Sequence, residues 1–257
     1  MKPARRIIDN INNGVLTTGV LLTDQCFPEM VEYCALAGID YLIIDREHGQ
    51  FDDQLTAQVC AIGRMSDFPV LVRPIDCAYA TIRRSIDIGP CGFLIPSVES
   101  AADLDVVRDA IYMPPRGSRR PGGPGNYWVS DFYAETWKKE VEDDFIVVPQ
   151  IETPKGLDNV EEIAAHEIVT AIGIGPYDLS HSIGVNFRMD HPRLVEATIR
   201  IREAGEKAGK TMWRIGHGPT LAAEGFHFLC VGETMGLLKG AMSQTQEQTR
   251  EAASGND

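Results

Sequence analysis

Two acidic residues, Glu152 and Asp178, each follow an apolar run of residues at the point where the run ends. Residues 145–151 form a strand-like run that ends at Glu152, and residues 169–176 form a second one just before Asp178. An acid at the end of a buried strand costs free energy unless it is hydrated, paired or bound to a cation. If the two strands are parallel neighbours, both carboxylates lie at one rim and, with water, make a site for a hard divalent cation.

A different reading of these acids stays open, because carboxylates near helix starts often cap the helix that follows.

Gln150 points to the same side as Glu152, since side chains alternate along a strand. The turn Gly175-Pro176 precedes Asp178 and leaves backbone N–H groups free to hold an anion such as a carboxylate.

Three further residues are candidates for acid–base and electrostatic chemistry. His48 follows a strand-like run and is a candidate general base, or else a loop histidine satisfied by a neighbouring acid. Arg73 ends an apolar run, where a guanidinium needs an anion or an ion pair with an acid of the rim. Asp87, on the next predicted helix, could be the partner of His48 in place of the adjacent Glu47, which the sequence alone does not decide.

Other arginines are harder to assign. The glycine-rich segment 114–126 carries Arg116, Arg119 and Arg120, and is either a mobile lid that meets an anionic substrate or a solvated loop. Arg214 lies inside a strand-like run and needs a partner there, and the sequence leaves open whether it points into the sheet's interior.

These residues lie on alternating strand-like and helical segments with no domain linker. Such alternation predicts a parallel sheet, and eight repeats predict closure into a single-domain (β/α)8 TIM barrel over residues 1–257, with a core of about 15–253. A doubly wound open sheet is the alternative. Active sites of such barrels lie at the C-terminal ends of the strands, where the candidate residues cluster. We expect strands at 15–22, 41–46, 69–73, 92–96, 145–152, 169–176, 211–215 and 226–231, with helices at 28–36, 52–65, 79–88, 101–113, 131–141, 157–165, 192–208, 219–223 and 235–253.

Composition excludes several classes of protein. The 257 residues include 24 basic and 37 acidic ones, and the formal net charge of −13 disfavours binding to nucleic acid or anionic membranes. The six cysteines are scattered without a C-x-x-C pair, which indicates reduced core residues of a cytoplasmic protein. The first residues lack the apolar run of a signal peptide, and no stretch approaches the roughly 18 apolar residues of a membrane span.

Six short motifs, in this order, resemble the HpcH/HpaI aldolase family of class II, metal-dependent pyruvate aldolases. The likeness extends from about the first predicted strand to the eighth. The motifs are residues 44–49 (Ile-Asp-Arg-Glu-His-Gly), 72–74 (Val-Arg-Pro), 95–98 (Ile-Pro-Ser-Val), 114–117 (Pro-Pro-Arg-Gly), 150–153 (Gln-Ile-Glu-Thr) and 174–180 (Ile-Gly-Pro-Tyr-Asp-Leu-Ser).

The resemblance implies a site and an assembly. A divalent ion (Mg²⁺, Mn²⁺ or Co²⁺) would be held by Glu152 and Asp178, and pyruvate would chelate it. Gln150 and the backbone near Gly175 and Pro176 would help to hold pyruvate. The barrel's last helix would be exchanged between subunits of a homohexamer built as a trimer of dimers.

The resemblance also implies catalytic roles. Arg73 would stabilise the enolate oxygen, and His48, supported by Asp87, would act through water as the acid–base group. Elementary chemistry agrees, because a cation on a keto oxygen acidifies the adjacent carbon, a guanidinium stabilises developing negative charge, and imidazole exchanges protons near neutral pH.

The expected activity is metal-dependent cleavage of a 4-hydroxy-2-oxo acid, sugar-derived or dicarboxylic, to pyruvate and an aldehyde through a metal-bound pyruvate enolate. The alternatives are decarboxylation of oxaloacetate at the same site, or a non-catalytic barrel that binds a small acid. Three departures from the family pattern concern the aldehyde side of the pocket: Arg46 where glycine is common, the arginines of 116–120, and the bulky strand at 211–215. Extra arginines there would suit an acidic or polyhydroxy substrate.

Overall fold

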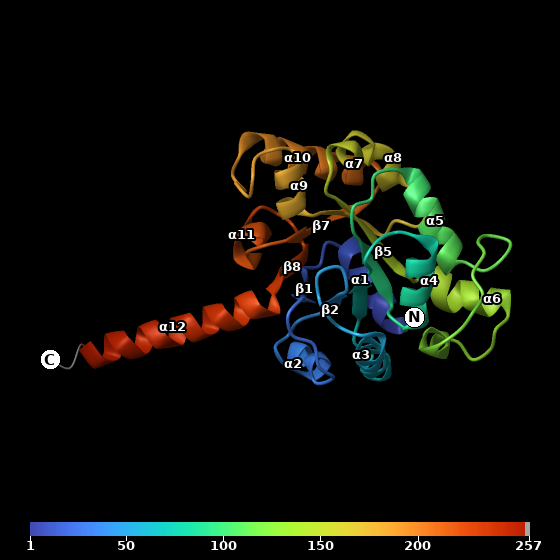
Figure 1. Ribbon diagram of the computed structural model, residues 1–257, viewed down its shortest axis with the longest axis horizontal. Coiled ribbons are helices and arrows are strands. Elements are labelled where there is room, and N and C mark those ends of the chain that lie inside the picture. The colour runs from blue at the N-terminus through green and yellow to red at the C-terminus, as the bar shows by residue number, and fades with distance from the viewer. Residues whose placement is uncertain (255–257) are drawn as a thin grey trace.

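The computed structural model describes residues 1–254 and forms one closed barrel. All eight strands are parallel and pair in chain order, with β8 returning to β1, and helices surround them (Figure 1). The predicted TIM barrel is confirmed, and the open-sheet alternative is wrong. None of the helices formed by residues 1–254 is both long and apolar enough to span a bilayer. All six cysteines are free thiols.

The strands agree with the predicted segments to within a few residues at each end. They are short, and in five of them (β2 to β6) every residue is buried, as expected when both faces of a parallel sheet are covered. Their bounds are β1 (Thr17–Leu22), β2 (Tyr41–Asp45), β3 (Val70–Arg73), β4 (Gly92–Ile95), β5 (Ile146–Ile151), β6 (Ala171–Ile174), β7 (Thr211–Ile215) and β8 (Phe228–Glu233).

The helices follow the strands as predicted, with two additions. An N-terminal helix precedes β1, and a helix follows β6 directly. The helices are α1 (Lys2–Asn12), α2 (Met30–Leu36), α3 (Asp53–Met65), α4 (Tyr79–Asp87), α5 (Ala101–Ile111), α6 (Ala134–Trp137), α7 (Pro154–Asp158), α8 (Val160–Ala165), α9 (Pro176–Ser182), α10 (Pro192–Lys207), α11 (Gly218–Ala223) and α12 (Thr234–Ser254).

Helix α1 was not predicted, because basic residues and asparagines flank its apolar stripe. Ala4, Ile7 and Ile11 recur at helical spacing and are buried. The carbonyl of Ile11 lies 3.1 Å from Nε2 of His227, immediately before β8. Helix α1 therefore packs at the N-terminal end of the barrel, away from the end that carries the candidate residues.

Aromatic side chains fill part of the barrel. Trp213 donates from Nε1 to the hydroxyl of Tyr41 over 2.9 Å, and that hydroxyl donates to the carbonyl of Leu229 over 2.8 Å. Gly19 faces the Tyr41 ring so closely that an added Cβ would overlap it. Glycine on β1 therefore makes room for the large side chain on the neighbouring strand β2, and both polar atoms of the Trp213–Tyr41 pair are satisfied.

The connection from α5 to β5, residues 112–145, is more ordered than expected. The predicted loop 114–126 ends in a 3-10 helix, η1 (Pro124–Trp128). The helix expected at 131–141 is shorter and changes from α6 to a π-helical turn, η2 (Lys138–Glu142).

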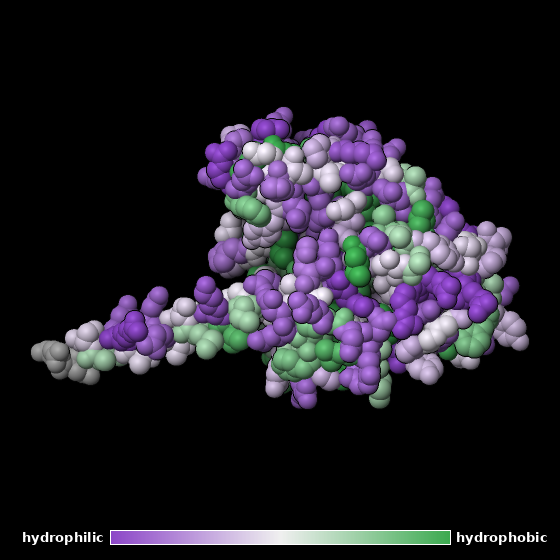
Figure 2. Space-filling model, viewed as in Figure 1, coloured by the Kyte–Doolittle hydropathy of each residue, from purple (hydrophilic) through white to green (hydrophobic). Residues whose placement is uncertain are grey.

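Helix α12 extends away from the barrel as a long arm (Figure 1). None of its residues is buried, although Met235, Leu237, Leu238 and Met242 are apolar. Figure 2 shows apolar side chains along this arm, most densely where it leaves the barrel. Such a helix exposes apolar surface that a single chain leaves uncovered.

Candidate functional site

The ends of β5 and β6 bring Glu152 beside Gly175. Ile151 pairs with Ile174 across the two strands, so the residues that follow lie at the same height. A Cβ at position 175 would overlap Oε1 of Glu152, which means that only glycine leaves room for this carboxylate. Ser182 of α9 donates to the Glu152 carbonyl over 2.8 Å and ties the helix to this strand end.

The Glu152 carboxylate is buried and half satisfied. Its Oε2 accepts from the backbone N–H of Ser97 over 2.7 Å and from the Ser97 hydroxyl over 2.9 Å. Its Oε1 is buried and accepts no hydrogen bond. Burial, followed by the negative charges of Glu47 and Asp178, raises the pKa of Glu152 to about 7. Glu152 does not cap α7, because the Thr153 hydroxyl does so.

Two more oxygen donors accompany Glu152. Gln150 is buried with a side-chain Oε1 that accepts no hydrogen bond. Asp178 lies exposed in the first turn of α9, and its charge raises the pKa values of Glu47 and Glu152, so the three carboxylates are electrostatic neighbours. Gln150, Glu152 and Asp178 were all predicted as site residues from the sequence.

At the ends of β2 and β3, Arg73 is held by two acids. Asp45 and Arg73 are register partners, and Arg73 donates from Nε and Nη2 to the two Asp45 oxygens over 2.9 and 2.6 Å. Arg73 Nη1 lies 3.3 Å from Oε2 of Glu47. Although burial opposes ionisation of both partners, their mutual hydrogen bonds lower the pKa of Asp45 and raise that of Arg73. The guanidinium at this rim therefore stays charged and fixed in place.

His48 lies on the loop after β2 with a side chain that is 56% exposed. Its Nε2 lies 3.7 Å from Oε2 of Glu47, the same oxygen that contacts Arg73. Glu47 thus stands between the imidazole and the guanidinium. Burial, opposed by Arg73 and assisted by Asp45 and Asp178, raises the pKa of Glu47.

Asp87 does not meet His48 within this chain. It ends α4 shortly before β4 begins, so it lies toward the N-terminal ends of the strands, whereas His48 follows the C-terminal end of β2. Its carboxylate accepts from Nη2 of Arg119 over 2.8 Å. Support of His48 by Asp87 stays a prediction, and it would need Asp87 of a second copy of the chain.

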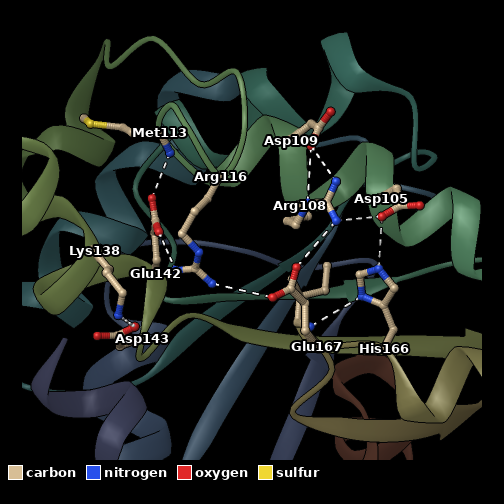
Figure 3. Close-up of polar contacts among 11 residues, drawn as sticks. Asp105, Arg108, Asp109, Met113, Arg116, Lys138, Glu142, Asp143, His166 and Glu167 are labelled. Atoms are coloured by element: carbon tan, nitrogen blue, oxygen red, sulfur yellow. Dashed lines mark hydrogen bonds and ion pairs between the residues drawn. The ribbon is translucent and has the colours of Figure 1, made fainter.

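Two of the three arginines of the expected lid, Arg116 and Arg119, are held by contacts with other parts of the protein, whereas Arg120 is exposed. Arg119 is fully buried over the Trp137 ring, 4.8 Å from its centroid, and donates to Asp87. Arg116 donates to Glu142 over 2.9 Å and lies 3.7 Å from Glu167, just before β6 (Figure 3). Figure 3 shows this network continuing through Arg108 on α5. Neither Arg116 nor Arg119 faces Glu152 in this chain, so the substrate-lid reading is not supported for them.

The donor set suits a hard divalent cation. Asp45, Glu47 and Glu152 lie near the Arg73 guanidinium, and the charge of Asp178 acts on Glu47 and Glu152. The Oε1 atoms of Gln150 and Glu152 lack hydrogen-bond donors. No group of three or more His, Cys, Asp or Glu residues within 1–254 has the spacing of a preformed metal site. A cation here would therefore take its remaining ligands from water or a bound acid.

Three residues that the structure brings to the site were assigned no role in the sequence analysis: Asp45, Glu47 and Ser97. Asp45 and Glu47 lie one residue either side of Arg46, so alternation along a strand turns their side chains to the same side. The apolar strand that ends in Arg73 indicated that an anion must lie near its guanidinium. Ser97 has a positive φ of 50°, an uncommon backbone conformation that the sequence does not show.

Comparisons with known proteins match nearly the whole of the described chain. A family model described as HpcH/HpaI aldolase/citrate lyase matches residues 21–238, which include every candidate residue above. Two proteins named 2-keto-3-deoxy-L-rhamnonate aldolase, from Shigella boydii serotype 4 and Escherichia coli O1:K1, are each 32% identical over 241 residues, covering 92% of this chain and 90% of theirs.

Solved structures give the same picture. An HpcH/HpaI aldolase from Desulfitobacterium hafniense DCB-2 has a TM-score of 0.85 and 26% identity, with 95% of this chain and 96% of that chain covered. An HpcH/HpaI aldolase/citrate lyase family protein from Burkholderia cenocepacia J2315 has a TM-score of 0.85 at 24% identity, covering 95% and 99%, and supports the fold alone.

Proposed function

Because the chain belongs to the HpcH/HpaI aldolase/citrate lyase family of carbon–carbon lyases, we propose that it cleaves a 4-hydroxy-2-oxo acid to pyruvate and an aldehyde. The relatives named 2-keto-3-deoxy-L-rhamnonate aldolase favour a sugar-derived 2-keto-3-deoxy acid as the substrate. The observation that carries the proposal is the buried Glu152 carboxylate, with one oxygen unsatisfied, close to the charge of Arg73. A non-catalytic barrel is set aside, since the family and the relatives are lyases.

Glu152 and Asp178 would hold a divalent cation (Mg²⁺, Mn²⁺ or Co²⁺), with Gln150 as a neighbouring oxygen donor. The cation would supply Lewis acidity to the keto group and offset the negative charge of these acids. Gly175 keeps the space that the Glu152 carboxylate needs, and Ser97 fixes the other carboxylate oxygen. The backbone at Gly175 and Pro176 would help to orient the substrate's carboxylate.

Arg73 would stabilise the negative charge that develops on the substrate's keto oxygen when the C3–C4 bond breaks. Two of its guanidinium nitrogens, Nε and Nη2, donate to Asp45. The third nitrogen, Nη1, lies next to Glu47 and would be the one that meets the substrate. Because the Arg73 guanidinium is already fixed in this way, it needs little reorganisation during the reaction, and this is the source of its catalytic benefit.

His48 would accept, through a water molecule, the proton of the C4 hydroxyl during cleavage and return a proton to C3 of pyruvate. Its exposed ring has access to water, and Glu47 is the acid within ion-pair distance of it among residues 1–254, at 3.7 Å. Asp87 would support His48 only across an interface between subunits, because the two residues lie at different ends of one barrel.

We include the assembly in the proposal. The uncovered apolar residues of α12 suit exchange of this helix between two subunits, and three such pairs would make the expected homohexamer. Burial of a face of this kind is the usual source of stability in permanent oligomers.

Oxalate tests the proposed site without knowledge of the aldehyde, because it mimics the planar enolate form of pyruvate. We expect oxalate to raise Tm in the presence of Mn²⁺, by mass action, and to have no effect in EDTA. Glu152→Gln should abolish the increase, whereas Arg200→Gln, on the outer face of α10, should keep it. An increase that persists in EDTA or in Glu152→Gln would contradict the proposed cation site.

A further inference from the structure

Arg214 points away from the barrel interior, a direction that the sequence left undecided. Trp213 faces inward and bonds to Tyr41, and side chains alternate along β7, so Arg214 faces the helices outside. Its guanidinium lies 4.8 Å from the centroid of the Phe226 ring. Arg214 is therefore separated from the Glu152 site by the wall of the barrel.

Arg214 has no close anion. Within residues 1–254 no hydrogen bond and no ion pair within 4 Å reaches its side chain, and its Nε is buried without a hydrogen-bond partner. Burial lowers the pKa of Arg214, and the exposed Glu224, which lies beyond ion-pair distance, opposes this only in part. A partly buried guanidinium without a hydrogen-bonded anion is costly, so an anionic ligand beside Arg214 would stabilise it.

Arg214 lines a cavity of about 280 Å³ between α10 and the end of α11. Val195 and Ile199 of α10 and Met189 before it form an aliphatic wall, and Phe226 lies below them. Val195 and Ile199 are 44% and 51% exposed, so the cavity keeps apolar surface uncovered. The second arginine of the lining, Arg202, is already paired with Glu206 at 2.9 Å. Glu224 also lines the cavity but lies beyond ion-pair distance of Arg214, so among residues 1–254 Arg214 is left without a hydrogen-bonded acid beside the aliphatic wall.

We propose that this cavity binds a monocarboxylate with an aliphatic body. The carboxylate would accept two parallel hydrogen bonds from the planar guanidinium of Arg214, and the aliphatic body of the ligand would cover Val195 and Ile199. A single charge matches the single unpaired guanidinium, and Glu224 at the rim disfavours a second negative charge. The site lies outside the barrel, so the proposal does not depend on the lyase reaction.

Calorimetric titration of the full-length wild-type protein with hexanoate tests the proposal. We expect saturable binding that is at least about tenfold tighter than binding of acetate, which lacks the body, and of hexanamide, which lacks the charge. Arg214→Met keeps the stem over Phe226 and should weaken hexanoate binding about tenfold or more. Val195→Glu, an exposed helix substitution that tolerates folding, should weaken it as well by charge repulsion.

Arg200→Gln is the matched control, because Arg200 lies on the same helix, is paired with Glu161 and does not line the cavity. It should leave hexanoate affinity unchanged. Equal affinity for hexanamide, unchanged affinity in Arg214→Met, or the absence of saturable binding would each overturn the proposal. Binding that weakens equally in Arg200→Gln would also overturn it, since the site would then lie elsewhere.

Discussion

Gly175 leaves the space that the Glu152 carboxylate occupies, because a Cβ added at position 175 would overlap Oε1 of Glu152. The register between β5 and β6 sets these two residues side by side. The oxygen beside Gly175 is also the one that accepts no hydrogen bond, so the glycine preserves a free ligand atom as well as space. The glycine and the carboxylate therefore act as one unit in the proposed cation site.

Gly175→Ala should weaken Mn²⁺ binding at least about tenfold, because the methyl group displaces the carboxylate from its position. The measurement is Mn²⁺ titration followed by calorimetry. Gly122→Ala is the control, since its Cβ would meet Asp87 at an ordinary contact distance of 3.6 Å, far from Glu152. Equal affinity of Gly175→Ala and wild type would show that Glu152 is not a ligand in this geometry.

Asp45→Asn should destabilise the protein by about 3–5 kcal/mol, because it leaves the buried Arg73 without its paired carboxylate. Urea unfolding gives the change directly. Arg200→Gln removes exposed ion pairs instead and should cost at most about 1 kcal/mol. Similar small losses in both variants would mean that the Asp45–Arg73 pair does not organise this rim.

Without metal, the contribution of Glu152 to the free energy of unfolding should decrease as the pH rises. Burial raises its pKa from the ordinary 4.5 to about 7, so its contribution is fully present below the unfolded pKa and is lost as the pH rises through 7. In EDTA, wild type should lose up to about 3 kcal/mol relative to Glu152→Gln between acidic and mildly alkaline pH. Urea unfolding across this range checks it, and a difference that stays constant with pH would contradict it.

Arg119→Ala should leave the preference between acidic and neutral aldehydes unchanged while it lowers stability. Arg119 is fully buried and pairs with Asp87, so its loss removes an internal contact and leaves a buried carboxylate unpaired. Substrate profiling together with Tm measures both effects. A changed acceptor preference at an unchanged Tm would return Arg119 to the role of a substrate contact.

Much of the site could be predicted because strand ends are visible in the sequence. Glu152, Asp178 and Arg73 each end or follow an apolar run, and parallel strands bring such ends to one rim. The barrel could be predicted because eight strand-like segments alternate with helical ones along the chain. Periodicity and chain order carry this information without any knowledge of side-chain contacts.

The remaining features depend on tertiary contacts that periodicity does not encode. Helix α1 is held by Ile7 and Ile11 against the barrel, although its own sequence is basic and rich in asparagine. The pairing of Asp87 with Arg119 joins α4 to the connection before β5, and no spacing rule links a helical residue to one 32 positions later on irregular backbone. The φ of Ser97, which aims its N–H at Glu152, is likewise fixed only in the folded chain.

The central claim is a metal-dependent pyruvate-releasing lyase at Glu152. The most direct measurement is pyruvate release from 2-keto-3-deoxy-L-rhamnonate and related 4-hydroxy-2-oxo acids, with Mn²⁺ or Mg²⁺ and with EDTA, in wild type and Glu152→Gln. We expect release that requires the metal and disappears in Glu152→Gln while the variant remains folded. Release that survives EDTA, or that Glu152→Gln retains, would contradict the account.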